Sequence, residues 1–214
     1  MKRHVIKSIS DVVLPLAVYL LSYRLIFLAV NCIYPALPPA FSMGISAAGT
    51  LFILFPFYKD TRQRFSQGRF MPSINNKLLI IMIIIIVSLS CIALNFFMSG
   101  FIDSDRAYKA ASVSLNSGNI IVRIISEGMI IPALEETVFR GIIMRRIFIN
   151  NGKAAALLVP ALLFGAVHMN MIQFIYASLS GILIGLTMMI TGRLYAVYFE
   201  HVIINMTVLL FGMI

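Results

Sequence analysis

Seven residues able to do acid–base, hydrogen-bonding or metal chemistry lie in the apolar C-terminal part of the chain. They are Glu135, Glu136, Arg140, His168, Glu200, His201 and Asn205. An ionisable side chain in an apolar membrane segment costs several kcal/mol unless it is paired or hydrated. Comparable residues are missing from the second and third apolar segments, so we expect the chemistry to be concentrated in the C-terminal third.

The two adjacent glutamates are predicted to have different roles. Glu136 and Arg140 are four residues apart, so on a helix they share one face and can form an ion pair. Glu135 lies about 100° around the helix from Glu136. It is therefore left free to act as a general base on a water molecule. The alternative is a structural ion pair at a helix end, with Glu135 reaching to the membrane interface.

His168 is predicted to lie at the same depth as Glu135. The sequence Asn150-Asn151-Gly152-Lys153 is typical of a turn between two antiparallel helices. Glu135 precedes the centre of this turn, and His168 follows it, by the same number of residues, which places both about 25 Å from it. A carboxylate and an imidazole at one depth can hold the same water molecule. A lone histidine in an apolar helix is otherwise most often a structural hydrogen-bond partner.

His201 and Asn205 follow a second predicted turn, at Thr191-Gly192-Arg193. Their four-residue spacing places them on one helix face. Two side chains with N–H donors at one depth can form an oxyanion hole, although such a pair is also common on a packing face. Glu200 points to a different face. We expect it to reach the interface or to pair with Arg193, outside the site.

The composition predicts the elements that carry these residues. Apolar residues make up 60% of the 214 residues and charged residues only 12%, against about 25% charged in soluble domains. Apolar windows of helix-spanning character lie at about 12–32, 41–58, 78–98, 118–134, 135–149, 154–170, 171–190 and 195–213. We predict an all-α, polytopic transmembrane bundle of about seven or eight helices, with the active site buried in the bilayer between the C-terminal helices.

The stretch from Gly118 to Asn150 is too long for one span, so we expect a kink or break near Pro132. We expect residues 1–214 to form a single transmembrane domain. Within it, residues 1–117 supply spans of generic character and residues 118–213 form the catalytic core.

The charge pattern predicts the orientation. The formal net charge is +9, and the basic residues fall in short stretches between apolar runs, as in topology signals and contacts with anionic lipid. We expect a multi-pass protein of the cell membrane with a cytoplasmic N-terminus, the loops at 59–77 and 150–153 inside, and those at 31–39 and 99–117 outside. No basic segment is interleaved with exposed aromatic residues, so nucleic-acid binding is not expected.

Three motifs in successive predicted spans resemble those of the CAAX-protease and bacteriocin-processing (CPBP, or Abi) family of intramembrane endopeptidases. The family pattern is EExxxR, then FxxxH, then HxxxN or HxxxD. Here the motifs read Glu135-Glu136-Thr-Val-Phe-Arg140, Phe164-Gly-Ala-Val-His168 and His201-Val-Ile-Ile-Asn205. The resemblance covers about residues 118–213.

The resemblance implies an intramembrane endopeptidase that cleaves a membrane-associated peptide or protein. Glu135 would activate water with the help of His168, and His201 and Asn205 would stabilise the oxyanion. Glu136, Arg140 and Phe164 would support these four residues. A small chain with short loops favours bacterial peptide maturation or bacteriocin self-immunity over prenyl-protein processing.

Zinc and two other functions stay open at this point. Glu135, His168 and His201 could ligate zinc, but an acid-activated water needs no metal, and we expect no cofactor. A proton-coupled transporter would also carry buried acids and histidines, although no inverted repeat is visible. A non-catalytic immunity or scaffold protein would retain the same fold. The protease hypothesis depends on a water-filled cavity at the depth of Glu135.

Overall fold

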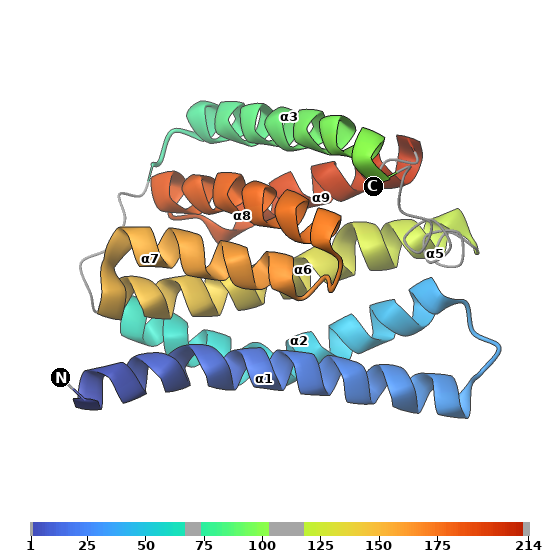
Figure 1. Cartoon of the computed structure of the whole chain (residues 1–214), viewed down its shortest axis with the longest axis horizontal. Coiled ribbons are helices and arrows are strands. Elements are labelled where there is room, and N and C mark those ends of the chain that lie inside the picture. Colours follow the sequence, from blue (N-terminus) through green and yellow to red (C-terminus); the bar gives the residue numbers. More distant parts are fainter. Residues whose placement is uncertain (1, 67–73, 103–117, 212–214) are drawn as a thin grey trace.

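The N-terminal half begins with two long helices that pack along one another. The computed structural model describes residues 2–66, 74–102 and 118–211. Helix α1 (Lys2–Ile33) and helix α2 (Pro39–Ser66) lie side by side along one side of the bundle (Figure 1). Helix α3 (Lys77–Ile102) lies on the opposite side.

A continuous helical rod carries the glutamates through the middle of the bundle. Its successive segments are α5 (Ile120–Ile125), η1 (Ser126–Ile130), α6 (Ile131–Glu136), η2 (Thr137–Met144) and the first part of α7 (Arg145–Ala166). Of the kink or break expected near Pro132, the break does not occur, because the helix continues through this residue. Pro132 directly follows the π-helical segment η1, where the backbone hydrogen-bond pattern of the rod changes. The predicted windows 118–134 and 135–149 therefore belong to one helix.

The predicted turn at residues 150–153 is confirmed. Gly152 has φ 82° and ψ −176° inside α7, a conformation that glycine adopts most readily, and the chain reverses there (Figure 1). Asn170 caps α8 (Met171–Thr191) by accepting hydrogen bonds from the backbone N–H groups of residues 172 and 173. Gly192, with φ 65°, ends α8 before α9 (Leu194–Phe211). Both α8 and α9 pack against α3.

The predicted fold class is confirmed: the protein is an all-helical, multi-pass membrane protein. In the described residues there is no strand, and six helices are long and apolar enough to cross a membrane. The fourth of them, Ile120–Ala166, contains the reversal at Gly152. The observed count is thus close to the predicted seven or eight. The core surrounds the rod, where Leu134, Val138 and Phe139 have no exposed surface.

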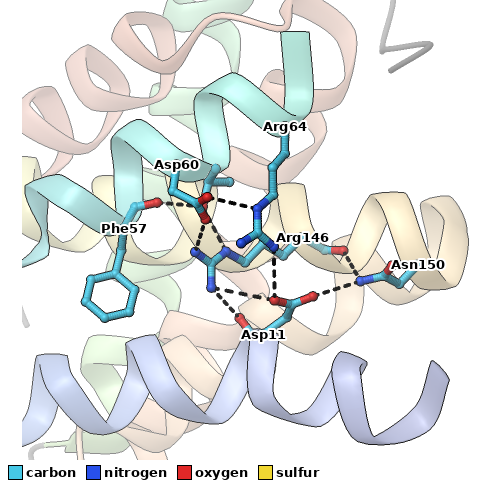
Figure 2. Close-up of polar contacts among 7 residues, drawn as sticks. Asp11, Phe57, Asp60, Arg64, Arg146 and Asn150 are labelled. Atoms are coloured by element: carbon cyan, nitrogen blue, oxygen red, sulfur yellow. Dashed lines mark hydrogen bonds and ion pairs between the residues drawn. The ribbon is translucent and has the colours of Figure 1, made fainter. Parts of the chain in front are cut away.

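Arg146 joins three helices at one end of the bundle (Figure 2). Its Nε donates to Thr61 Oγ1 at 2.8 Å and its Nη2 donates to Asp60 Oδ2 at 3.1 Å, both on α2. Its Nη1 lies 3.8 Å from Asp11 Oδ1 on α1. Residues 59–66 are thereby held in α2, which extends past its predicted end at residue 58.

The N-terminus and the turns at Gly152 and Gly192 lie at this same end of the bundle (Figure 1). The segments predicted to share the cytoplasmic side therefore lie together, and their assignment to the cytoplasm stays a prediction. The predicted outer loop at 99–117 lies, from residue 103 onward, outside the described residues.

Candidate active site

The four residues predicted to be catalytic line one cavity. Glu135, His168, His201 and Asn205 all contribute to a partly open cavity of about 420 Å³. Glu135 comes from α6, His201 and Asn205 from α9, and His168 from the turn that follows α7. His168 therefore lies just beyond the end of the helix in which it was expected. It lines a cavity of the kind that the protease hypothesis requires. A space of this size holds several water molecules or part of a peptide.

Glu136 binds two residues of the site through one carboxylate oxygen. Its Oε1 accepts hydrogen bonds at 2.7 Å from both Arg140 Nη1 and His201 Nδ1. Both Glu136 and Arg140 are 1% exposed. The predicted Glu136–Arg140 pair is thus present, and it also fixes His201, which the spacing of residues did not reveal.

Arg140 is fixed in turn by α8. Its Nη2 donates to the carbonyl oxygen of Gly181 at 3.1 Å. A β-carbon at position 181 would lie 3.2 Å from both Cα and Cβ of Ala161, so glycine allows α8 to approach α7 closely. The close approach places the Gly181 carbonyl within reach of the guanidinium group.

The hydrogen-bond partners assign the proton on His201. Because Oε1 of Glu136 already accepts a hydrogen bond from Arg140, we assign Nδ1 of His201 as the donor to the same oxygen. A neutral His201 then carries no proton on Nε2, which lies 3.6 Å from Glu135 Oε2. This distance is too long for a direct hydrogen bond. His201 can donate to an oxyanion only when it carries a second proton.

The same reasoning applies to His168. Its Nδ1 lies 2.8 Å from the carbonyl oxygen of Phe164, and a carbonyl can only accept. Nδ1 therefore carries the proton of the neutral ring, and Nε2 is left as an acceptor. His168 is half-buried at the cavity, so this nitrogen is suited to receive a hydrogen bond from water.

Phe164 holds the two histidines at a fixed separation. Its ring meets His168 edge-on with centroids 5.1 Å apart and His201 with centroids 5.7 Å apart. The guanidinium carbon of Arg140 lies 5.0 Å from its ring centroid, within the range of a cation–π contact. Phe164 thus contacts both histidines and the cation behind them.

Asn205 is half-buried, lines the cavity and makes a hydrogen bond to the rod. Its Nδ2 donates to the carbonyl oxygen of Glu127 at 3.0 Å. An amide nitrogen has two N–H bonds, so one remains for a ligand in the cavity. The pairing with Glu127 could not be predicted, because the two residues are far apart in the sequence.

Glu200 does not follow the prediction made for it. It has no exposed surface and accepts a hydrogen bond from Thr187 Oγ1 at 2.7 Å, whereas Arg193 donates to Asn75. The expected Glu200–Arg193 pair is wrong because α9 turns Glu200 inward, against α8. Glu200 is not in the cavity lining, so its exclusion from the predicted site agrees with the structure.

The cavity also has a wall that the motifs did not indicate. Tyr19 and Tyr23 of α1 line it together with Glu135. Their spacing of four residues places both on one face of α1. This spacing was visible in the sequence, but nothing there showed that this face of α1 turns toward the glutamates.

The donor set of the cavity resembles a zinc site in chemistry, since it offers a carboxylate and two imidazole nitrogens. In the part of the chain that the structure describes, however, no group of three His, Cys, Asp or Glu side chains is arranged to hold a metal ion. These residues do not fit a metal as they are placed. Catalysis without a metal stays a prediction.

The fold and the cavity define a class: a multi-pass helical membrane protein with a carboxylate–histidine site among its spanning helices. Residues 117–207 match the family model described as Rce1-like, type II CAAX prenyl endopeptidase. This is the CPBP family, so the resemblance read from the three motifs is confirmed. The match supports an intramembrane endopeptidase of the CAAX type that acts on a peptide substrate in the lipid bilayer. The comparisons with curated proteins and with solved structures gave no match.

Proposed function

We propose that this protein is an endopeptidase that hydrolyses a peptide bond in a membrane-associated peptide or protein by means of a water molecule activated by Glu135. One observation carries the proposal: Glu135, His168, His201 and Asn205 line one cavity of about 420 Å³. The physiological role that we favour is maturation of bacterial peptides or self-immunity to a bacteriocin. The N-terminus would face the cytoplasm across the cell membrane.

The proposed reaction needs only groups of this chain. Glu135 removes a proton from water while the water oxygen attacks the carbonyl carbon of the peptide, and Nε2 of His168 accepts the second hydrogen bond of that water. The electron pair of the carbonyl bond moves to its oxygen, which receives a hydrogen bond from Asn205. When the tetrahedral intermediate collapses, the C–N bond breaks and Glu135 returns the proton to the leaving nitrogen. His201, held by Glu136, keeps its Nε2 beside Glu135 throughout.

The test compares two buried acids in purified protein. The probes are two quenched fluorescent peptides, one with a farnesylated cysteine followed by three residues and one with the same sequence without the lipid. We expect Glu135→Gln and His168→Ala to lower kcat by about 10²–10⁴-fold, the usual contribution of a general base. Glu200→Gln is the matched control, because Glu200 is also buried but lies outside the cavity.

The outcomes separate the alternatives. Cleavage by Glu135→Gln at the wild-type rate would refute the mechanism, and an equal loss in Glu200→Gln would contradict the assignment of the site. Cleavage that is insensitive to 1,10-phenanthroline supports the metal-free reaction, whereas full inhibition would favour zinc. Proton flux into liposomes on addition of peptide, without cleavage, would favour a transporter.

A further inference from the structure

The cavity has an excess of hydrogen-bond acceptors over donors. Glu135 begins the reaction as a carboxylate and then holds the proton of the water for the leaving nitrogen, so it is not a donor to the oxyanion. Both His168 and His201 present Nε2 without a proton when neutral, because their Nδ1 atoms donate elsewhere. Peptide hydrolysis develops negative charge on the carbonyl oxygen, and this charge needs donors. One N–H of Asn205 is the only donor so far identified for it, since the other binds Glu127.

Few other donors can reach the cavity space. The hydroxyl oxygens of Tyr176 and Ser180 have almost no accessible surface, although other atoms of these residues line the cavity. Gln173 lines the cavity as well, but it already takes part in another interaction. The two tyrosines of α1 differ from it, because neither hydroxyl has a hydrogen-bond partner in the described part of the chain.

Tyr19 is the better placed of the two. Its side chain is only 8% exposed, while Tyr23 is half-buried. Its ring meets Phe139 edge-on with centroids 5.9 Å apart, and Phe139 lies one turn after Glu135 on the same rod. Tyr19 is thus held at the level of Glu135, and both tyrosines line the same cavity as that carboxylate.

The ring of Tyr19 is buried, but its hydroxyl is not among the enclosed polar atoms that lack a partner, so it is open to the cavity that Tyr19 lines. Tyrosine hydroxyls in such positions usually have a hydrogen-bond partner. A phenylalanine at position 19 would make the same ring contact with Phe139. The hydroxyl therefore points to a ligand that enters the cavity.

We propose that Tyr19 is a further catalytic residue, whose hydroxyl donates a hydrogen bond to the oxyanion of the tetrahedral intermediate, together with Asn205. The inference rests on the proposed function, because an oxyanion forms only if a peptide bond is hydrolysed. Tyr19 keeps its proton throughout the reaction, and the proton of the water still passes through Glu135 to the leaving nitrogen. The first hundred residues would then contribute to the chemistry as well as to the fold.

The experiment is the substitution Tyr19→Phe in the full-length protein, assayed with the two quenched peptides. We expect kcat to fall by about 10²-fold, the effect of removing one oxyanion donor, while KM changes by less than about threefold. The melting temperature should not fall, because the ring keeps its contact with Phe139 and the hydroxyl loses no partner in the protein. Tyr34→Phe is the matched control, since Tyr34 is 62% exposed in the turn after α1 and lies outside the cavity.

Each outcome supports or overturns the proposal. A large loss of kcat in Tyr19→Phe alone, at unchanged KM and melting temperature, supports it. Wild-type kcat in Tyr19→Phe overturns it and leaves the proposed function standing if Glu135→Gln is inactive. A rise in KM at constant kcat, or a lower melting temperature, would also overturn it, because Tyr19 would then serve substrate binding or folding. If the wild type cleaves neither peptide, the proposed function and this inference fail together.

Discussion

Two arginines on the same rod, six residues apart, have different surroundings. Arg146 is bound by groups from α1 and α2, namely Asp11, Asp60 and Thr61 (Figure 2). Arg140 is bound by Glu136 and by the carbonyl of Gly181. Both guanidinium groups are buried. Arg146 lines an open pocket of about 330 Å³ together with its own ion-pair partners, whereas Arg140 is linked to the cavity of Glu135 through Phe164 and, by way of Glu136, through His201.

The difference is one of charge balance and hydrogen-bond completeness. Around Arg146, two arginines face two aspartates, and Asn150 donates to the carboxylate of Asp11 at 3.2 Å. Around Arg140, two glutamates and two histidines share a single permanent cation. A balanced network stabilises a fold, whereas one that leaves acceptors open can bind and activate a ligand. We therefore interpret the Arg146 network as a structural clamp and the Arg140 network as the support of the proposed active site.

The largest effect is expected from Glu136→Ala, which tests whether the Arg140 network supports both the fold and the site. This change leaves Arg140 and His201 buried without their anionic partner, and breaking a buried pair in this way costs about 3–5 kcal/mol. We expect a large drop in thermal stability in detergent and loss of cleavage. Glu136→Gln, which keeps the shape and one acceptor, should lose clearly less stability. Equal stability of Glu136→Ala and wild type would mean that the pair does not support the fold.

Arg146→Met tests the clamp without entering the cavity. The substitution removes the buried donor to Thr61 and one of the two arginines that bind Asp60, so we expect a loss of about 1–3 kcal/mol in the free energy of unfolding. Residual folded protein should cleave peptide with the kcat of the wild type. Arg62→Met is the control, because Arg62 is exposed on the same end of α2. A loss of kcat in folded Arg146→Met would contradict the separation of clamp and site.

The contrast also explains what could be predicted from the sequence. The Glu136–Arg140 pair follows from helix geometry, because partners four residues apart lie on one face of any helix. The shared depth of Glu135 and His168 follows from the length of a hairpin, and Gly152 supplied its turn. The membrane class follows from composition. Each of these features depends on short-range rules.

The features that could not be predicted depend on how separate helices turn toward one another. Three features are of this kind: the burial of Glu200 against α8, the hydrogen bond from His201 Nδ1 to Glu136, and the position of Tyr19 at the cavity. Each depends on contacts between residues that are distant in the sequence. The continuity of the rod at Pro132 is a different case. A proline at this position predicts the end of a helix, but the helix continues because the preceding π-helical segment η1 accommodates the proline.

The smallest expected effect is that of Arg64→Ala, which tests whether exposed members of the clamp matter. Arg64 is 50% exposed and its Nε lies 2.9 Å from Asp60 Oδ1, one helical turn away. Exposed pairs of this kind contribute about 0.3–0.5 kcal/mol, so the melting temperature should fall only slightly. At 1 M salt the difference from wild type should vanish, because charges are screened within about 3 Å there. The effect of Arg146→Met should largely persist at 1 M salt, since its bond to Thr61 is buried and Thr61 is uncharged. A salt-insensitive loss in Arg64→Ala as large as that in Arg146→Met would show that the whole network acts as one unit, rather than as a buried arginine with weakly coupled neighbours.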